Sequence, residues 1–104
     1  MSKAKIFSGI CGFTTEVEAR MNGSHCELSI ESDCEEIQHL AEELRKVDPF
    51  REITHRGEGP LTLQLAITHC PHPSCPVPVG ILKTIEVEAG LALPADVSIE
   101  ISKE

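Results

Sequence analysis

Two segments of alternating polar and apolar residues, separated by a turn sequence, stand out in the first third of the chain. In residues 13–21 the odd-numbered positions are apolar or Thr and the even-numbered ones are polar, which is the period-2 pattern of a half-buried strand. Residues 25–31 alternate in the same way. Asn22-Gly23 lies between them and is typical of a type I′ turn, in which both central residues have positive φ. This pattern predicts a β-hairpin.

The turn also predicts a register. If Asn22-Gly23 forms a two-residue loop, Ala19 faces Cys26, and the other inward positions of one strand likewise face apolar residues of the other. The same register brings Cys11 and Cys34 to the open end of the hairpin. We therefore expect these two cysteines to leave the sheet at the same end.

A helix is predicted to follow the hairpin. The sequence Ser32-Asp33-Cys34-Glu35 has the form of a capping box, and apolar residues then recur at helical spacing as far as Val47. Asp48-Pro49 ends the helix. With Ser32 as the N-cap, Cys34 lies in the first turn, where free backbone N–H groups and the helix dipole lower the pKa of a thiol.

The second half of the chain alternates strand and helix patterns. Residues 50–55 are interpreted as a short strand and residues 61–67 as a clearer one, with a helix that starts at Gly59-Pro60 as the alternative for the latter. Residues 76–89 have helical spacing, and residues 97–101 alternate again as the last strand.

This order of elements predicts an α+β fold. We expect a two-layer ββαβαβ domain with two helices packed on one face of a mostly antiparallel sheet. At 104 residues the chain is long enough to bury one core without disulfide bonds, so residues 1–104 are expected to form a single domain.

Composition and charge narrow the expected partners. The net charge of −8 and the absence of Trp and Tyr argue against nucleic acid and against an anionic membrane surface, because phosphate groups would be repelled and bases would lack stacking partners. The apolar patch at residues 6–13 is too short for a signal peptide or a membrane span. We therefore expect a cytoplasmic protein that binds neither nucleic acid nor membrane.

Five cysteines in a reducing compartment are better explained as metal ligands or redox groups than as a disulfide framework. Cys26 lies in the middle of a strand, on its apolar face, and is expected to be a core residue. Four remain as candidates: Cys11 and Cys34, from the hairpin end, and Cys70 and Cys75, from a stretch rich in His and Pro.

Four thiolates at one end of a small domain can bind zinc or hold an iron–sulfur cluster. The spacing of Cys70 and Cys75 differs from the Cys-x-x-Cys of structural zinc sites and favours a cluster. His69 and His72 flank Cys70 as further possible ligands. The first hypothesis is a small cytosolic protein that binds a metal or iron–sulfur centre and serves in electron transfer or metal handling.

Two other classes of function stay open. One is a thiol redox protein or a cysteine nucleophile, with Cys34 as the thiolate and His69 or His72 as the base. The other is an interaction module whose cysteines only pack, with a protein partner or a homodimer formed through an exposed strand. No motif in the sequence names a reaction, and whether the protein is an enzyme stays open.

Four fragments carry a resemblance to a known family: Cys11-Gly12-Phe13-Thr14-Thr15, Ile30-Glu31-Ser32-Asp33-Cys34, Cys75-Pro76-Val77-Pro78 and Leu93-Pro94-Ala95-Asp96-Val97. Together they resemble a family of small uncharacterised proteins from anaerobic bacteria and archaea, over nearly the whole chain. The resemblance implies no reaction. An anaerobic setting would favour an iron–sulfur cluster over zinc.

Overall fold

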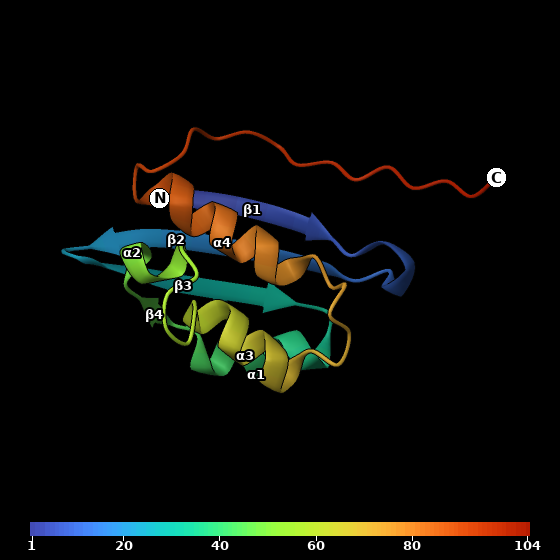
Figure 1. The fold of residues 1–104 in the computed structure, drawn as a ribbon, viewed down its shortest axis with the longest axis horizontal. Helices are drawn as coiled ribbons and strands as arrows, with labels where there is room; N and C mark the ends of the chain where they lie inside the picture. Colours follow the sequence, from blue (N-terminus) through green and yellow to red (C-terminus); the bar gives the residue numbers. More distant parts are fainter.

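A four-stranded antiparallel sheet carries all of the helices on one face (Figure 1). The computed structural model describes all 104 residues. In chain order the elements are β1 (Ser2–Phe7), the 3-10 turn η1 (Gly9–Cys11), β2 (Thr14–Asn22), β3 (His25–Ser32), α1 (Glu35–Glu43), β4 (Lys46–Val47), α2 (Pro49–Glu52), α3 (Leu61–His69) and α4 (Val77–Glu88). The strands lie in the order β1-β2-β3-β4. The predicted α+β class is confirmed.

The helices form the second layer. Helix α4 packs on β1 and β2, α1 packs on β3, and α3 lies against both α1 and α4. The buried core lies between the sheet and these helices. Its members are Val17, Ala19, Cys26, Leu28, Ile37, Leu40, Leu44, Val47, Val77, Ile81 and Ile85. Cys26 is fully buried among them, as its place in the strand pattern predicted.

The hairpin register differs from the expected one by two positions. Asn22 pairs with His25, so the loop consists of Gly23 and Ser24. Gly23 has a φ of +66° and occupies the first central position, a place where glycine meets no steric penalty. Ala19 therefore faces Leu28 rather than Cys26. Because the shift is an even number of residues, the apolar face of each strand is the predicted one.

Two predicted strands of the second half are wrong. Residues 61–67 belong to helix α3, and within residues 50–55 the structure has the short helix α2 in place of a strand. The buried carboxylate of Glu52 explains the start of α3. It accepts hydrogen bonds of 2.9 Å from each of the backbone N–H groups of Leu61 and Thr62, which would otherwise be unpaired at a helix N-terminus.

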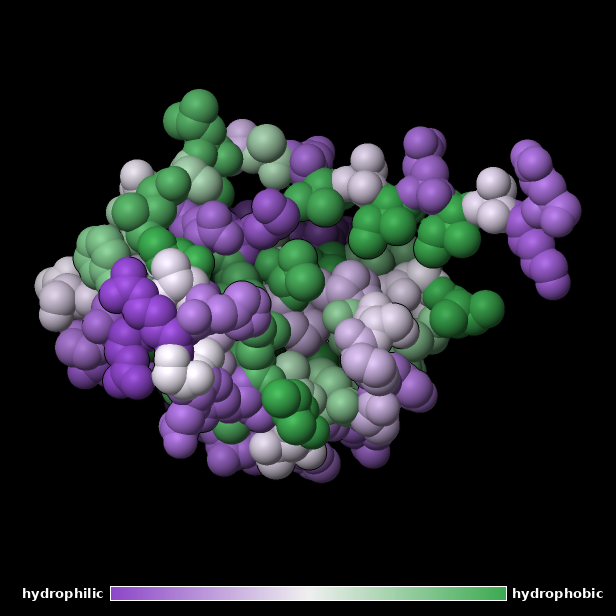
Figure 2. All heavy atoms as spheres, viewed as in Figure 1, coloured by the Kyte–Doolittle hydropathy of each residue, from purple (hydrophilic) through white to green (hydrophobic).

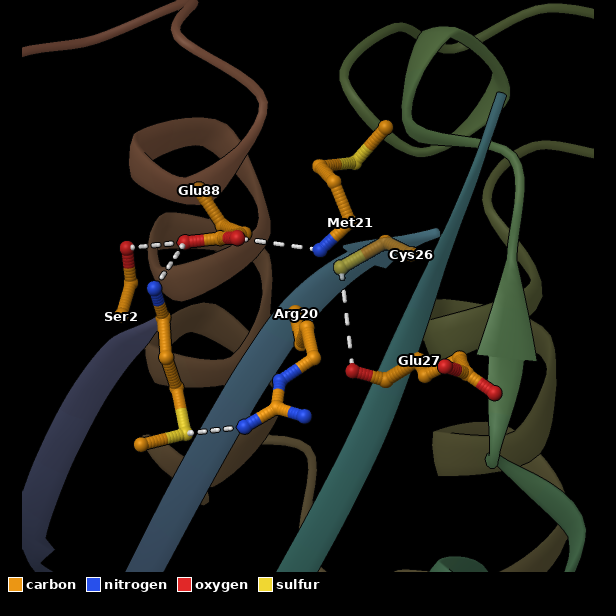
Figure 3. A network of polar contacts seen from close by, with 7 residues as sticks. Ser2, Arg20, Met21, Cys26, Glu27 and Glu88 are labelled. Carbon is orange, nitrogen blue, oxygen red and sulfur yellow. Dashed lines mark hydrogen bonds and ion pairs between the residues drawn. The ribbon is translucent and has the colours of Figure 1, made fainter. Parts of the chain in front are cut away.

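Strand β1 was not predicted, and it makes β2 a central strand. It alternates exposed and half-buried residues. Helix α4 approaches it closely at Gly80, where an added Cβ atom would lie 2.3 Å from Cδ1 of Ile6. The other end of α4 is tied to the sheet by Glu88, whose carboxylate meets Ser2 and Met21 (Figure 3).

The predicted last strand, residues 97–101, is not part of the sheet. Beyond α4 the chain continues to Glu104 without a helix or strand. In Figure 1 this segment runs from left to right, in the same direction as the β1 arrow. The ββαβαβ order is therefore wrong in detail. It overlooked β1 and β4, and it counted residues 61–67 and 97–101 as strands.

Candidate functional site: a cluster of three thiols

Three segments lie at the same end of the sheet. They are the junction between β3 and α1, the loop between α3 and α4, and, at the same end, the η1 turn (Figure 1). The first carries Cys34 and the second carries Cys70 and Cys75. All three of these side chains are half-buried and pack against the hydrophobic core. We call Cys34, Cys70 and Cys75 the thiol cluster.

The thiols of Cys34 and Cys75 lie close enough to Cys70 to affect its pKa. Burial is the largest cause that raises the pKa of Cys70 to about 11, followed by the neighbouring Cys75 and Cys34 thiols. A second thiolate next to the first would add a like charge, which disfavours ionisation further. Without a bound cation the Cys70 thiol therefore stays protonated at neutral pH.

Cys34 takes a place different from the predicted one. It is the N-cap residue of α1, with extended backbone, and its own N–H donates a 3.1 Å hydrogen bond to the Ser32 hydroxyl. The Cys34 thiol donates to a carboxylate oxygen of Glu36 at 3.2 Å. Ser32 is thus not the N-cap, because its hydroxyl bonds instead with the Cys34 N–H and with Thr15.

The expected lowering of the pKa of Cys34 is also wrong. Burial is the largest effect and raises this pKa, and the hydrogen bond to the Glu36 carboxylate raises it too, because that bond needs the protonated thiol. The backbone N–H groups of Glu36 and Ile37 act in the opposite direction without reversing the shift.

The loop that carries Cys70 and Cys75 is restricted by its sequence. Cys70 is the C-cap residue of α3, and its N–H donates a 2.8 Å bond to the carbonyl of Ala66. The Cys75 N–H donates to the carbonyl of His72 at 3.2 Å. Prolines fix φ at positions 71, 73, 76 and 78. These backbone hydrogen bonds and the prolines together hold both thiols next to the start of α4.

The remaining predicted ligands lie around the cluster rather than in it. Cys11 is exposed in η1 and takes no part in the interactions that define the thiol cluster. His69 forms a hydrogen bond with Glu43 of α1. His72 is exposed in the loop and lies near enough to Glu36 to contribute to the lowered pKa of that carboxyl, for which the Cys34 hydrogen bond is the largest cause.

Glu36 is a member of the site that sequence reasoning missed. Its side chain is exposed on the first turn of α1. The Cys-x-Glu spacing of Cys34 and Glu36 across a helix start is the signal that points to it. The rim of the cluster is therefore acidic, with a histidine nearby.

As the side chains stand, no group of three or more His, Cys, Asp or Glu residues is arranged to hold a metal ion. The side chains of the thiol cluster would have to move to ligate one together. No helix is long and apolar enough to cross a membrane.

The fold and the cluster define a small α+β domain with three interacting thiols at one end of its sheet. The chain belongs to a family of unknown function, DUF6951, whose model matches residues 2–101. The expected resemblance to an uncharacterised family is thereby confirmed. No curated protein and no solved structure matches the chain.

Proposed function

We propose that this protein binds a thiophilic metal centre, either a zinc ion or an iron–sulfur cluster, through Cys34, Cys70 and Cys75, with Cys11 of the η1 turn, at the same end of the sheet, as the fourth ligand. It would serve in metal handling or electron transfer in the cytoplasm. The observation that carries the proposal is the meeting of three partly buried thiols, from two separate chain segments, at the end of the sheet that also holds Cys11.

The chemistry of the cluster supports metal binding over nucleophilic catalysis. A nucleophilic cysteine needs a thiolate near neutral pH, whereas the pKa of Cys34 is raised and that of Cys70 is about 11. A metal ion removes this obstacle, because it replaces the thiol protons and neutralises the charge of adjacent thiolates. His69, the expected base, is already bonded to Glu43.

The surroundings of the cluster also favour a ligand over simple packing. The Cys26 side chain, a member of the hydrophobic core, is completely buried, whereas the three clustered cysteines remain partly accessible. Glu36 and His72 lie at the rim of the thiol cluster. The carboxylate oxygen of Glu36 and the imidazole nitrogen of His72 can bind a metal ion. The loop between Cys70 and Cys75 lies on the surface, so a metal ion can reach its thiols from solvent.

Purification under anaerobic conditions, followed by metal analysis and an absorption spectrum, tests the proposal. We expect about one zinc ion per chain, or iron with the visible absorption of a cluster. The single variants Cys34→Ser, Cys70→Ser and Cys75→Ser should lose the metal. Cys26→Ala is the matched control, because that thiol lies in the core away from the cluster, and it should keep the metal.

Cys11→Ser tests the fourth ligand separately. Loss of metal in this variant supports a four-cysteine site, and retention assigns the fourth position to another group. A protein that binds neither iron nor zinc, purified without oxygen and reconstituted with either metal, would contradict the proposal and leave a packing role for the cysteines.

A further inference from the structure

Strand β1 forms an open edge of the sheet. It is the first strand in the sheet order and pairs only with β2. The side chains that it turns toward α4, Ala4 and Ile6, are half-buried although both pack against the core. Val79 on the neighbouring helix is 51% exposed. One more strand along β1 would cover these groups and satisfy the free backbone groups of the edge.

The C-terminal segment has the pattern of such a strand. Val97, Ile99 and Ile101 are 55%, 73% and 90% exposed, and they alternate with polar residues. Figure 2 shows this alternation of green and purple side chains along the part of the chain that runs to the C-terminus. The segment forms no backbone hydrogen bond to the sheet. Exposed β-branched residues in this number are typical of a surface that another element covers.

The charges of the two elements are complementary. Lys3 and Lys5 lie on the side of β1 that faces away from α4. If the apolar residues of the C-terminal segment point toward α4, the period of a strand places Asp96 and Glu100 on the lysine side. Lys3 forms an exposed ion pair of 3.7 Å with Glu18, whereas Lys5 forms no ion pair. Opposite charges on adjacent strands stabilise the pairing.

The second open edge of the sheet does not fit this segment. Strand β4 pairs with β3 only at Cys26 and Glu27, so the rest of β3 borders a shallow groove next to α1. Glu31 and Glu42 line that groove with a single Arg45. Acidic residues on an added strand would meet like charges there, which disfavours the pairing.

We propose that Val97–Ile101 of one copy of this chain pairs as a fifth strand with the β1 edge of a second copy, and that the exchange is reciprocal. Glu88, at the end of α4, bonds to Ser2 at the start of β1, so the C-terminal segment begins within reach of its own β1. Its apolar residues nevertheless remain exposed. A two-fold exchange buries both segments and both edges at once.

The first test is the oligomeric state of the full chain by light scattering over a range of concentrations. We expect a dimer for the wild type and a monomer for Ile99→Asp, which places a charge on the face that packs against α4. Leu93→Asp is the matched control, because Leu93 lies in the same arm, is 89% exposed and precedes the paired segment. It should remain a dimer.

A charge exchange distinguishes a second copy from the chain's own segment. One full chain carries Lys3→Glu and Lys5→Glu, and the other carries Glu100→Lys. Each alone places like charges together, so each should be mainly monomeric, whereas the mixture should form a heterodimer in which the charges are again opposite. Circular dichroism confirms that both variants fold.

Three results would overturn the proposal. They are a wild-type chain that is monomeric at every concentration, an Ile99→Asp variant that still dimerises, and a mixture of the two charge variants that does not associate. Hydrogen exchange adds a direct readout. Slow exchange of the 97–101 amides in a monomer would assign the segment to its own β1 edge and would also contradict exchange between copies.

Discussion

The carboxylate of Glu88 on α4 accepts a 2.9 Å hydrogen bond from the backbone N–H of Met21 on β2, 67 residues away in sequence. Its other oxygen accepts a bond of 2.8 Å from the Ser2 hydroxyl (Figure 3). Strand β1 begins at Ser2, which pairs with Ala19, and so offers Met21 no strand partner. Glu88 takes that place and joins α4 to the open end of the β1–β2 pair.

The first prediction concerns the pH dependence of stability. The hydrogen bond from Met21 is the largest cause of the lowered pKa of Glu88, followed by the bond from Ser2. A carboxyl whose pKa is lower in the folded chain contributes stability above its unfolded pKa and loses it as the pH falls through the folded value. We expect Glu88→Gln to lower the free energy of unfolding at neutral pH by about 1 kcal/mol, and by less in acid.

Urea unfolding at about pH 7 and about pH 3 measures the difference, since these values lie on either side of a carboxyl pKa. Glu86→Gln is the control, because Glu86 lies on the same helix and forms no hydrogen bond or ion pair with another side chain. If Glu88→Gln and the wild type lose the same free energy of unfolding between neutral pH and acid, Glu88 is not the cause of the pH dependence.

The second prediction concerns Glu52, which is 3% exposed. Besides the two N–H groups at the start of α3, it accepts a 2.6 Å bond from the Thr62 hydroxyl. Glu52→Ala leaves these donors without a partner, and we expect the free energy of unfolding to fall by about 2–4 kcal/mol. Glu52→Gln should also destabilise the fold, because its amide NH₂ would face N–H donors.

Denaturant titration of both variants, with exposed Glu58→Ala as the control, tests this role. Because Cys70 is the C-cap residue of α3, a loosened α3 should also increase hydrogen exchange in the loop that carries the thiols. A wild-type free energy of unfolding for Glu52→Ala would rule out the cap.

The sequence predicted the faces of the hairpin, because a period-2 pattern records which side of a strand is buried. The register depended on which two residues form the turn. The alternating pattern fits a turn at Asn22-Gly23 and a turn at Gly23-Ser24 equally well, because both registers leave the same residues on the apolar face. Similarly, residues 61–67 carry apolar side chains at positions that suit a strand. They form a helix because the carboxylate of Glu52, nine residues before Leu61, caps it and because α1 and α4 cover two of its sides.

The candidate site was predictable in part. Sequence spacing placed Cys34 at the end of the hairpin and Cys70 and Cys75 before a helix, and the fold brings these three together. The direction of the Cys34 pKa shift was wrong, because the helix terminus was visible in the sequence but the burial of the thiol and its bond to Glu36 were not. Cys11 is exposed because it lies in η1. A turn of this length has no hydrophobic periodicity, so the sequence pattern did not predict it.

The third prediction concerns the close contact of α4 with β1. A Cβ atom at Gly80 would lie 2.3 Å from Cδ1 and 2.7 Å from Cγ1 of Ile6. Gly80→Ala gains about 1 kcal/mol of helix propensity, but overpacking costs about 1–3 kcal/mol. We expect a net loss of about 1 kcal/mol in the free energy of unfolding.

A double-mutant cycle separates the two effects. In an Ile6→Ala background the two clashing atoms are absent and only Cβ of residue 6, at 3.9 Å, stays near the extra methyl group, so Gly80→Ala should there be neutral or stabilising. Thermal or urea unfolding of the four chains measures the coupling. If Gly80→Ala is equally destabilising in both backgrounds, the contact with Ile6 is not the cause.

The last prediction concerns the reactivity of the thiols in the reduced, metal-free protein. Thiolates, not thiols, react with iodoacetamide. Because the pKa of Cys70 is raised to about 11 and that of Cys34 is also raised, both should react slowly at neutral pH, with rates that rise as the pH approaches the raised values. Exposed Cys11 should be modified first.

Mass spectrometry of peptides after timed alkylation assigns each rate, and urea-unfolded protein gives the intrinsic rates. Glu36→Gln should speed the reaction of Cys34, because the charge and the accepted hydrogen bond that favour its protonated form are weakened. Rapid modification of Cys34 or Cys70 in the folded protein near pH 7 would instead favour a thiol redox or nucleophilic role for the cluster.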